Sequence, residues 1–416
     1  MKSNGPVEIA IIGGGASGLA AAIAAADERE KRGLSGSVLV VEKNQEAGRK
    51  LLATGNGRCN FSNRLCSWKD FHSDSPTFAR GILERFSPRH IVAFFESLGL
   101  WAREEEGGRV YPLSGQAASL RKVLVENAAH RHVEFLLETS VVSASYEGEG
   151  FRLTLSDGEE LWAKKLIIAS GGRAGMQFGS DGDGYGFAKS FGHTLVPPHP
   201  ALVAMTSQGI SELKGVRVRG KVALLRKGEE VAKSQGEIQF GKDLLSGICC
   251  FDVSRFVERE AAAAGEYALR LDVFPDFTDE ELNLRLWELC STLAFRPCEV
   301  LLHGLLPEKL GEYCFQRWGM DGSRLAGSLT SWEVRDLCAL LKDLDFPVTG
   351  TLGWKEAQVS AGGVNTEQID PVTLESKLQK GLYFAGEVLD VDGPCGGYNL
   401  QWAFASGIAA GRAAAR

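Results

Sequence analysis

Short apolar runs alternate with amphipathic stretches along the first 200 residues. Residues 7–12 (VEIAII) and 38–41 (VLVV) are β-branched runs of the kind found in buried parallel strands. Between them, the Ala-rich stretch 20–26 contains no helix-breaking residue and predicts a helix. The order of strand, helix and strand predicts a βαβ unit at the start of the chain.

The same reading predicts that this unit continues into a larger α/β domain. Alternation and helical periodicity predict, in chain order, helices over 75–98 (interrupted at Pro88) and 116–131, a hairpin over 101–111, and strands over 133–137, 141–144, 151–155, 161–164 and 166–169. A glycine-rich segment then leads into a helix over 185–191.

The pattern changes at residues 196–201, where three prolines in four residues predict a linker between domains. Short strands over 216–218, 222–225 and 237–240 predict a small β domain, and residues 278–344 have helical periodicity. We therefore expect an inserted domain over 195–350. The first domain would comprise residues 1–194 and 351–416, with returning strands over 358–364 and 381–385 and a helix over 399–410.

Glycines of a G-x-G-x-x-G motif follow the first strand. Gly13 permits the tight turn, Gly15 lets the backbone approach a pyrophosphate, and Gly18 lets the helix pack closely on the strand. Glu42 ends the second strand, 24 positions after Gly18, where a carboxylate can bind ribose hydroxyls. The alternative is a glycine turn without a ligand, but the strands, helix and acid together favour a dinucleotide site.

A second glycine-rich segment, residues 43–63, follows Glu42. Cations and amides alternate along it, so it could lie along a diphosphate and reach the reactive ring. A polar surface loop is the alternative. The glycines, cations and amides of this segment are Gly48, Gly55, Gly57, Arg49, Lys50, Arg58, Asn56, Asn60 and Asn63.

The C-terminal segment GEVLDVDGPCGGYNLQWA predicts a second helix N-terminus in the first domain. A turn of Gly393, Gly396 and Gly397 precedes the helix that starts near Asn399. Such a helix end would stabilise negative charge on a reduced isoalloxazine, which favours FAD over NAD. The alternative is a helix that merely completes the domain.

Composition narrows the class of protein. A net charge of −7 gives no basic footprint for nucleic acid, and no apolar run is long enough to cross a membrane. Nine cysteines without a C-x-x-C pair fit reduced thiols in the cytoplasm. Asp181 and Asp183 lack the closing glutamate of a calcium loop, so no metal is expected.

Five segments resemble the BaiN-like family of bacterial NAD(P)/FAD-dependent oxidoreductases. They are GGGASGLAAA, GRKLLATGNGRCNFSN, GSDGDGYGFAKSFGH, GEIQF…SGI and TLESKLQKGLYFAGEVLDVDGPCGGYNLQWAFASG. The resemblance covers nearly the whole chain. It implies FAD in a Rossmann-like domain, with an inserted β-barrel-like and helical domain over the flavin.

Motif by motif, the resemblance also implies the FAD contacts. They are Gly13, Gly14, Gly15, Ala16, Ser17, Gly18, Glu42, Lys43, Arg49, Lys50, Asn56, Gly57, Arg58, Val141, Ser170, Gly171, Gly386, Glu387, Asn399 and Leu400. Two departures bear on specificity or activity. The family's GEIQFT-x-YGISG reads GEIQFGKDLLSG here, with Gly241, Asp243 and Leu244 at the changed positions, and no proline follows Gly172.

The first hypothesis is an FAD-dependent oxidoreductase that moves hydride between flavin and a small organic substrate. NADH or NADPH is a candidate reductant that would dock transiently, because no second dinucleotide fingerprint occurs; an oxidase that uses dioxygen is equally compatible. The rivals are a flavin-binding sensor or scaffold and a flavoprotein that acts on RNA.

Catalytic side chains are weakly determined by the sequence, which also leaves the oligomeric state open. His193 and His199 are expected to be structural. The weak catalytic candidates are Arg58, Cys59, Asp183 and Tyr185.

Overall fold

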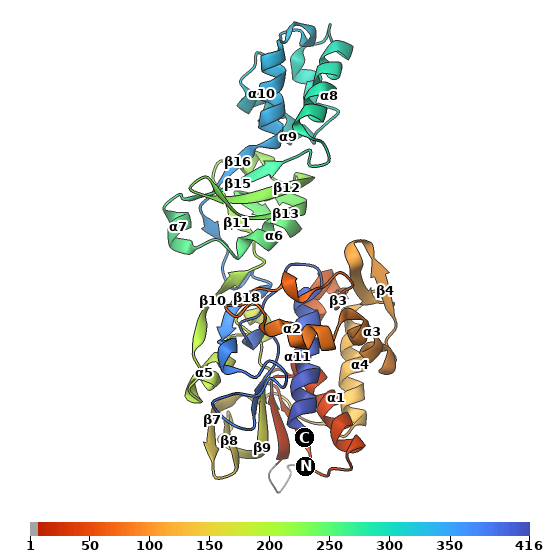
Figure 1. Cartoon of the computed structure of the whole chain (residues 1–416), viewed down its shortest axis with the longest axis vertical. Coiled ribbons are helices and arrows are strands. Elements are labelled where there is room, and N and C mark those ends of the chain that lie inside the picture. Colours follow the sequence, from red (N-terminus) through yellow and green to blue (C-terminus); the bar gives the residue numbers. More distant parts are fainter. Residues whose placement is uncertain (1–6) are drawn as a thin grey trace. The chain divides into compact units, whose positions relative to one another are not determined.

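The computed structural model describes residues 7–416, which form two compact units (Figure 1). The first unit comprises the chain up to Pro200 together with Gln358–Arg416, and the second is Ala201–Ala357. The boundaries expected after residues 194 and 350 lie a few residues N-terminal to these. Each unit has its own hydrophobic core.

The first unit is built on a seven-stranded sheet whose centre is parallel. β1 (Val7–Ile12) lies between β2 (Val38–Val41) and β9 (Glu160–Ile168), and β6 (Glu134–Leu136) extends the sheet beyond β2. On the other side, β8 (Gly150–Leu155) and β7 (Val141–Glu147) are antiparallel, and β19 (Leu382–Phe384) pairs with the end of β9. The C-terminal part of the chain thus returns to the sheet that the first residues started.

Helices α1 (Ala16–Lys31) and α11 (Tyr398–Ala414) pack closely against each other in this unit (Figure 1). A Cβ at Gly407 would lie 2.3 Å from the Ser17 carbonyl oxygen, and one at Gly411 would lie 2.2 Å from that of Ala21. Only glycine permits this approach. It places the middle of α11 beside the first turn of α1.

The remaining helices of the first unit follow the predicted pattern. Pro88 does begin a second helix, as the first residue of α3, where a missing N–H costs nothing. These helices are α2 (Phe78–Arg85), α3 (Pro88–Ser97), α4 (Ala117–His130) and α5 (Asp183–Ser190). A small sheet of β3 (Ser62–Asn63), β5 (Arg109–Pro112) and β4 (Ala102–Glu105) completes the unit, with the 3-10 segment η1 (Arg49–Gly57) preceding it.

Three sequence predictions differ from the structure. One difference is that the strands expected over 216–218 and 222–225 form the single strand β12 (Arg217–Arg226). The proline-rich segment does contain the boundary between the units, after Pro200, but it forms the strand β10 (Leu195–Ala201), which pairs with β18 (Val359–Val364) in a two-stranded sheet. Such a strand tolerates prolines because it has an unpaired edge. The strands expected over 161–164 and 166–169 form the single strand β9, because a parallel and an antiparallel neighbour cover successive parts of it.

The second unit begins with a seven-stranded sheet in the order β16-β15-β12-β13-β14-β11-β17. Only Thr349 separates β16 from β17, which lie at opposite edges, so the sheet curls into a barrel-like shape. Its elements are β11 (Met205–Thr206), β12 (Arg217–Arg226), β13 (Glu229–Phe240), β14 (Leu244–Ser246), α6 (Ile248–Ser254), α7 (Arg259–Ala263), β15 (Tyr267–Asp272), β16 (Leu344–Val348) and β17 (Gly350–Thr351).

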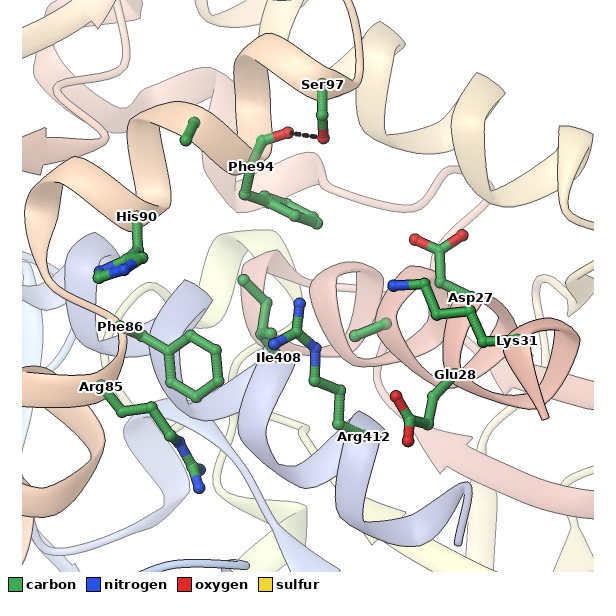
Figure 2. Close-up of a pocket in the computed structure, with 12 residues that line it drawn as sticks. Asp27, Glu28, Lys31, Arg85, Phe86, His90, Phe94, Ser97, Ile408 and Arg412 are labelled. Atoms are coloured by element: carbon green, nitrogen blue, oxygen red, sulfur yellow. Dashed lines mark hydrogen bonds between the residues drawn. The ribbon is translucent and has the colours of Figure 1, made fainter.

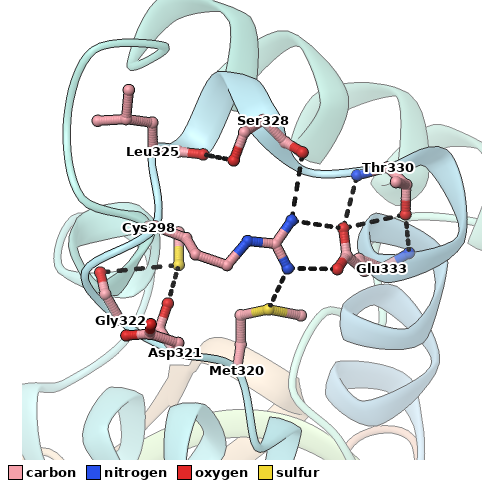
Figure 3. A network of polar contacts seen from close by, with 9 residues as sticks. Cys298, Met320, Asp321, Gly322, Leu325, Ser328, Thr330 and Glu333 are labelled. Atoms are coloured by element: carbon pink, nitrogen blue, oxygen red, sulfur yellow. Dashed lines mark hydrogen bonds and ion pairs between the residues drawn. The ribbon is translucent and has the colours of Figure 1, made fainter.

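Three helices form the rest of the second unit: α8 (Asp279–Thr292), α9 (Glu308–Trp318) and α10 (Ser331–Lys342). Capping boxes start α8 and α10, at Thr278 and Thr330. Glu333 closes the second box and also binds Arg324 through both carboxylate oxygens (Figure 3). The network thus fixes the loop before α10 to its first turn. Among residues 7–416, no helix has the length and apolar character needed to cross a bilayer.

The Arg324–Glu333 pair predicts an acid-sensitive second unit. The Arg324 guanidinium, with the Thr330 N–H, lowers the pKa of Glu333 to about 2. A carboxyl group whose pKa is lowered by folding stabilises the fold above its unfolded pKa, and that stability is lost as pH falls towards 2. We expect Glu333→Gln to flatten this part of the pH dependence of unfolding. Urea denaturation at pH 7, 5 and 3, followed by tryptophan fluorescence, measures it. If the free energy of unfolding falls equally steeply with pH in wild type and in Glu333→Gln, the lowered pKa assigned to Glu333 is contradicted.

Candidate functional site

The β1–α1 turn has the three glycine geometries that a pyrophosphate loop needs. Gly13 has φ of 102°, and a Cβ there would lie 2.6 Å from the Ala169 carbonyl oxygen. A Cβ at Gly18 would lie 1.9 Å from the Gly13 carbonyl oxygen. At Gly15, by contrast, a Cβ would have no neighbour within 4 Å. The first and third glycines are therefore required by packing, and Gly15 alone faces open space.

Within the described part of the chain, no side chain caps the N-terminus of α1 next to that space. Gly15 is the N-cap and supplies no side chain, and the first turn contains no acidic residue. The N–H groups of the first turn and the positive end of the helix dipole are thus free to bind an anion. A dinucleotide pyrophosphate fits this donor set.

Glu42, at the end of β2, organises the turn from the other side. Its Oε2 accepts the Gly14 N–H at 2.8 Å, and its Oε1 accepts the Asn44 N–H at 2.8 Å and the Asn44 side-chain amide at 2.7 Å. Its backbone oxygen accepts the Thr139 N–H, which brings the strand that starts at Val141 beside it. Glu42 is therefore both a structural clamp on the glycine turn and a buried acceptor next to the helix end.

Ser170 follows the carboxyl end of β9, the edge of the sheet where α/β proteins bind ligands. Its hydroxyl is buried and has no hydrogen-bond partner among the described residues. Gly171 continues the chain with φ of 78°. An unsatisfied buried hydroxyl costs free energy, so Ser170 fits a site that a polar cofactor completes.

A cluster of polar groups joins η1 to the C-terminal segment. Lys50 Nζ lies 2.8 Å from Glu387 Oε2 and 2.9 Å from the Ala174 carbonyl oxygen. Glu387 Oε1 accepts the Ser360 N–H at 2.8 Å, and Ser360 Oγ accepts the N–H groups of Arg173 and Ala174. The two predicted residues, Lys50 and Glu387, are thus ion-paired with each other.

Gly386 lies on the α1–α11 pair. Its N–H is donated to Ser406 Oγ at 2.9 Å, and its carbonyl accepts Trp402 Nε1 at 3.2 Å. A Cβ there would lie 2.5 Å from Ser17 Oγ. The structure thereby brings the C-terminal segment to the first turn of α1.

The N-terminus of α11 is shaped by the loop before it. The N-cap, Gly397, has φ of 101° and no side-chain cap. Asn399 exchanges hydrogen bonds with the backbone of Gly393, at 2.9 and 2.7 Å, so its side chain holds the loop. Asn63 donates to the Gly396 carbonyl at 2.9 Å, which ties the end of the 43–63 segment to this helix start. Leu400 follows in the first turn, partly buried.

Other predicted cofactor residues have protein partners or face solvent. Lys43 Nζ lies between Asp181 and Asp183, at 2.6 and 2.8 Å, and the two carboxylates raise its pKa against the opposing effect of burial. Arg58 pairs with Glu105, and its guanidinium lies 4.2 Å from the Tyr111 ring centre. The exposed members of the set are Arg49, Asn56 and Gly57.

The weak catalytic candidates differ in what their surroundings permit. Cys59 is buried, which raises its pKa to about 12 and keeps it a neutral thiol, and Asp183 is held by Lys43. The Tyr185 hydroxyl is buried and has no hydrogen-bond partner among residues 7–416, and burial, then the Glu387 charge, raises its pKa. Tyr185 therefore stays protonated at neutral pH and is the candidate best suited to hold a proton.

The two histidines next to β10 are partnered inside the first unit. His193 Nε2 lies 2.8 Å from Ser376 Oγ and its ring packs edge-on against Phe384, while burial lowers its pKa. His199 Nδ1 lies 3.4 Å from the Pro197 carbonyl oxygen. Both contacts fit the structural role expected for these residues.

The sequence reading missed Ser360, Trp402 and Ser406. Ser360 contacts Arg173, 187 residues away in the sequence, whereas Trp402 and Ser406 contact Gly386 within the C-terminal segment. Only Trp402 and Ser406 lay in a segment that the sequence had singled out, the C-terminal motif.

Comparison with known proteins identifies a family and relatives that this chain resembles. The family model described as "HI0933-like protein Rossmann domain" matches residues 7–413. A 3-dehydro-bile acid delta(4,6)-reductase of Clostridium scindens is 38% identical over 409 residues, which are 98% of each chain. A ribosomal RNA dihydrouridine synthase of Escherichia coli is 31% identical over 410 residues, 95% of each chain.

A solved structure shares the fold at greater distance. The 3-ketosteroid-delta4-(5alpha)-dehydrogenase of Rhodococcus jostii superposes with a TM-score of 0.50 at 16% sequence identity, covering 100% of this chain and 98% of that one. At this identity the likeness concerns the fold alone.

Proposed function

Since the chain belongs to the HI0933-like Rossmann family and is an FAD-dependent oxidoreductase, we propose that it reduces a carbon–carbon double bond conjugated to a carbonyl group. The family predicted from the motifs is confirmed, as are the Rossmann-like fold class and the assignment as an enzyme. The substrate and the source of electrons belong to the proposal.

The observation that carries the proposal is the 38% identity over 98% of both chains with a bile acid delta(4,6)-reductase. Its name describes removal of ring double bonds next to a 3-oxo group. The dihydrouridine synthases, by name, saturate uridine, whose C5–C6 bond is conjugated to a ring carbonyl. By name, both kinds of relative therefore saturate a carbon–carbon double bond conjugated to a carbonyl group, on different substrates. We propose this class of reaction, and neither particular substrate, for this chain.

Bound FAD, once reduced by NADH or NADPH, would supply hydride to the β-carbon of such a system, and a proton would add to the α-carbon. We infer that the open N-terminus of α1 holds the pyrophosphate, with Glu42 beside it as acceptor for the ribose hydroxyls. Ser170 would satisfy its free hydroxyl on the cofactor. The uncapped start of α11 would face the flavin edge that gains negative charge. NADH or NADPH would deliver electrons transiently.

A small enone is favoured over ribosomal RNA as substrate. Residues 201–357 contain 19 Lys and Arg against 24 Asp and Glu, a net charge of −5. An acidic second unit repels a polyphosphate backbone. The RNA reading remains the second candidate function because two dihydrouridine synthases match 95–96% of this chain. The sequence-based expectation of no nucleic acid partner therefore stays a prediction.

The test is a two-step anaerobic experiment on the FAD-loaded protein. NADH or NADPH is added first, and we expect the visible flavin band to bleach. A 3-oxo-4-ene bile acid is then added, and we expect the band to return with a product two hydrogens heavier. A transcript of ribosomal RNA is the parallel arm, assayed for dihydrouridine by mass spectrometry.

Each outcome has a definite meaning. If the enone reoxidises the reduced flavin and the RNA does not, the proposal is supported. If dihydrouridine forms and the enone is not reduced, the proposed enone reduction is replaced by the RNA activity. Flavin that is reduced but reoxidised only by dioxygen would identify an oxidase and refute both.

A further inference from the structure

A cavity lies in the first unit at the end of α1 and α11 opposite to their cofactor-facing N-termini (Figure 2). Its volume is about 470 Å³, within the range of small-molecule sites. Helices α1, α3 and α11 and the end of α2 line it. The lining residues that matter below are Lys31, Arg85, Phe86, Phe94, Ile408 and Arg412.

Two carboxylates also line the cavity, and both are neutralised from outside it. Asp27 pairs with Arg131 at 2.5 Å, and Glu28 pairs with Arg32 at 2.7 Å and with Arg416 at 3.5 Å. The Arg32 hydrogen bond, and the charges of the other arginines, lower the pKa of Glu28, so it is ionised and paired at neutral pH. The lining carboxylates are thus already committed to cations.

The lining cations differ from the lining carboxylates in their ion pairs. Neither Lys31 nor Arg412 forms a salt bridge with any carboxylate in the part of the chain that the structure describes, and Arg85 donates only to the Val372 carbonyl, at 2.7 Å. Partial desolvation and the charges of Arg412 and Arg416 lower the pKa of Arg85. The lining therefore carries three cations, Lys31, Arg85 and Arg412, against two carboxylates that are also paired with arginines outside the lining.

An apolar surface lies next to these cations. The guanidinium groups of Arg85 and Arg412 lie 4.8 and 5.4 Å from the ring centre of Phe86, which is buried. Figure 2 shows the Arg412 guanidinium between Phe86 and Phe94, with Lys31 reaching towards it and Ile408 alongside. One side of the space is therefore aromatic and aliphatic, and its middle is cationic.

We propose that this cavity binds a small aromatic carboxylate. The carboxylate of the ligand would bind the planar guanidinium group of Arg412, with Lys31 as the second cation. The aromatic ring of the ligand would lie against Phe86, Phe94 and Ile408. A planar anion satisfies the guanidinium's parallel donors, and an apolar body displaces water from the aromatic wall. Neither an inorganic anion nor a neutral aromatic molecule satisfies both surfaces.

Calorimetric titration of the FAD-loaded protein with 1-naphthoate tests the proposal. We expect saturable one-to-one binding that is at least about tenfold tighter than that of 1-naphthamide or inorganic phosphate. Arg412→Met and Phe86→Leu should each weaken naphthoate binding by about tenfold or more. Arg89→Met is the matched control, since Arg89 is exposed on α3 outside the lining, and it should bind as wild type.

Three results would overturn the proposal. Equal binding of 1-naphthamide would show a purely apolar site, and equal binding of phosphate would show a plain cationic patch. Naphthoate binding that is absent, or present but unchanged in Arg412→Met and Phe86→Leu, would exclude this cavity. Because Phe86 is buried, its variant counts only if its melting temperature stays near that of wild type; Arg412→Met carries the test otherwise.

Discussion

Gly15→Ala is expected to leave folding intact and to weaken FAD binding strongly. A Cβ at this position meets no protein atom within 4 Å, and the residue has φ of −77°, which alanine adopts readily. The methyl group would instead occupy the space over the first turn of α1. Loss of one or two phosphate hydrogen bonds, at about 1.5–3 kcal/mol each, corresponds to a weakening of roughly 10-fold to well over 1,000-fold.

Gly18→Ala is the matched control, because the same methyl group is added three residues later. Its Cβ would lie 1.9 Å from the Gly13 carbonyl oxygen, so α1 would have to move away from β1. We expect the melting temperature of the apoprotein to fall in Gly18→Ala and to be unchanged in Gly15→Ala. Fluorescence titration with FAD and thermal denaturation of the apoproteins measure the two effects. Unchanged FAD affinity in Gly15→Ala would refute the pyrophosphate site.

Glu42→Arg is expected to abolish FAD retention during purification. The arginine would remove the acceptor for the Gly14 N–H and the two Asn44 donors, and it would put a cation where the ribose hydroxyls need an acceptor. Because this change also disturbs the turn, retention alone cannot separate the two roles of Glu42. Glu42→Gln separates them more cleanly.

Glu42→Gln keeps the shape of the side chain but has only one acceptor oxygen. One of the two oxygens that Gly14 and Asn44 now use would become a donor, at a cost to apoprotein stability of about 1.5–3 kcal/mol. If Glu42 also binds the ribose, the FAD dissociation constant of the folded protein should rise by about tenfold or more. A less stable apoprotein with wild-type FAD affinity would leave Glu42 as a clamp on the turn only.

The departures from the family pattern at Gly241, Asp243 and Leu244 lie in the second unit. Two of the positions that depart from the family pattern have local structural roles there: Asp243 adopts φ of 55° and accepts the Ser211 hydroxyl at 2.8 Å, and Leu244 begins β14. These contacts hold a turn in the barrel-like sheet. Asp243 and Leu244 are thus accommodated by the fold.

The sequence by itself determined the local elements and the dinucleotide turn. Residues 7–12 and 38–41 are strands with the predicted bounds, and Pro88 starts the predicted second helix. These follow from periodicity, glycine spacing and proline chemistry, which act over a few residues. The spacing of Gly13 and Gly18 also predicted the tight turn and the close packing of α1 on β1, and the structure shows both; the approach of a pyrophosphate at Gly15 stays a prediction.

Only the tertiary structure decided which groups remain available to a cofactor. Lys43, Lys50 and Arg58 looked equivalent as candidate cofactor contacts, but each is paired with a carboxylate distant in the sequence, at Asp181, Glu387 and Glu105 respectively. Pairing of β10 with β18, more than 150 residues away, likewise turned a proline-rich linker into a strand. Charge pairing and strand pairing depend on residues brought together by folding, and no local pattern encodes them.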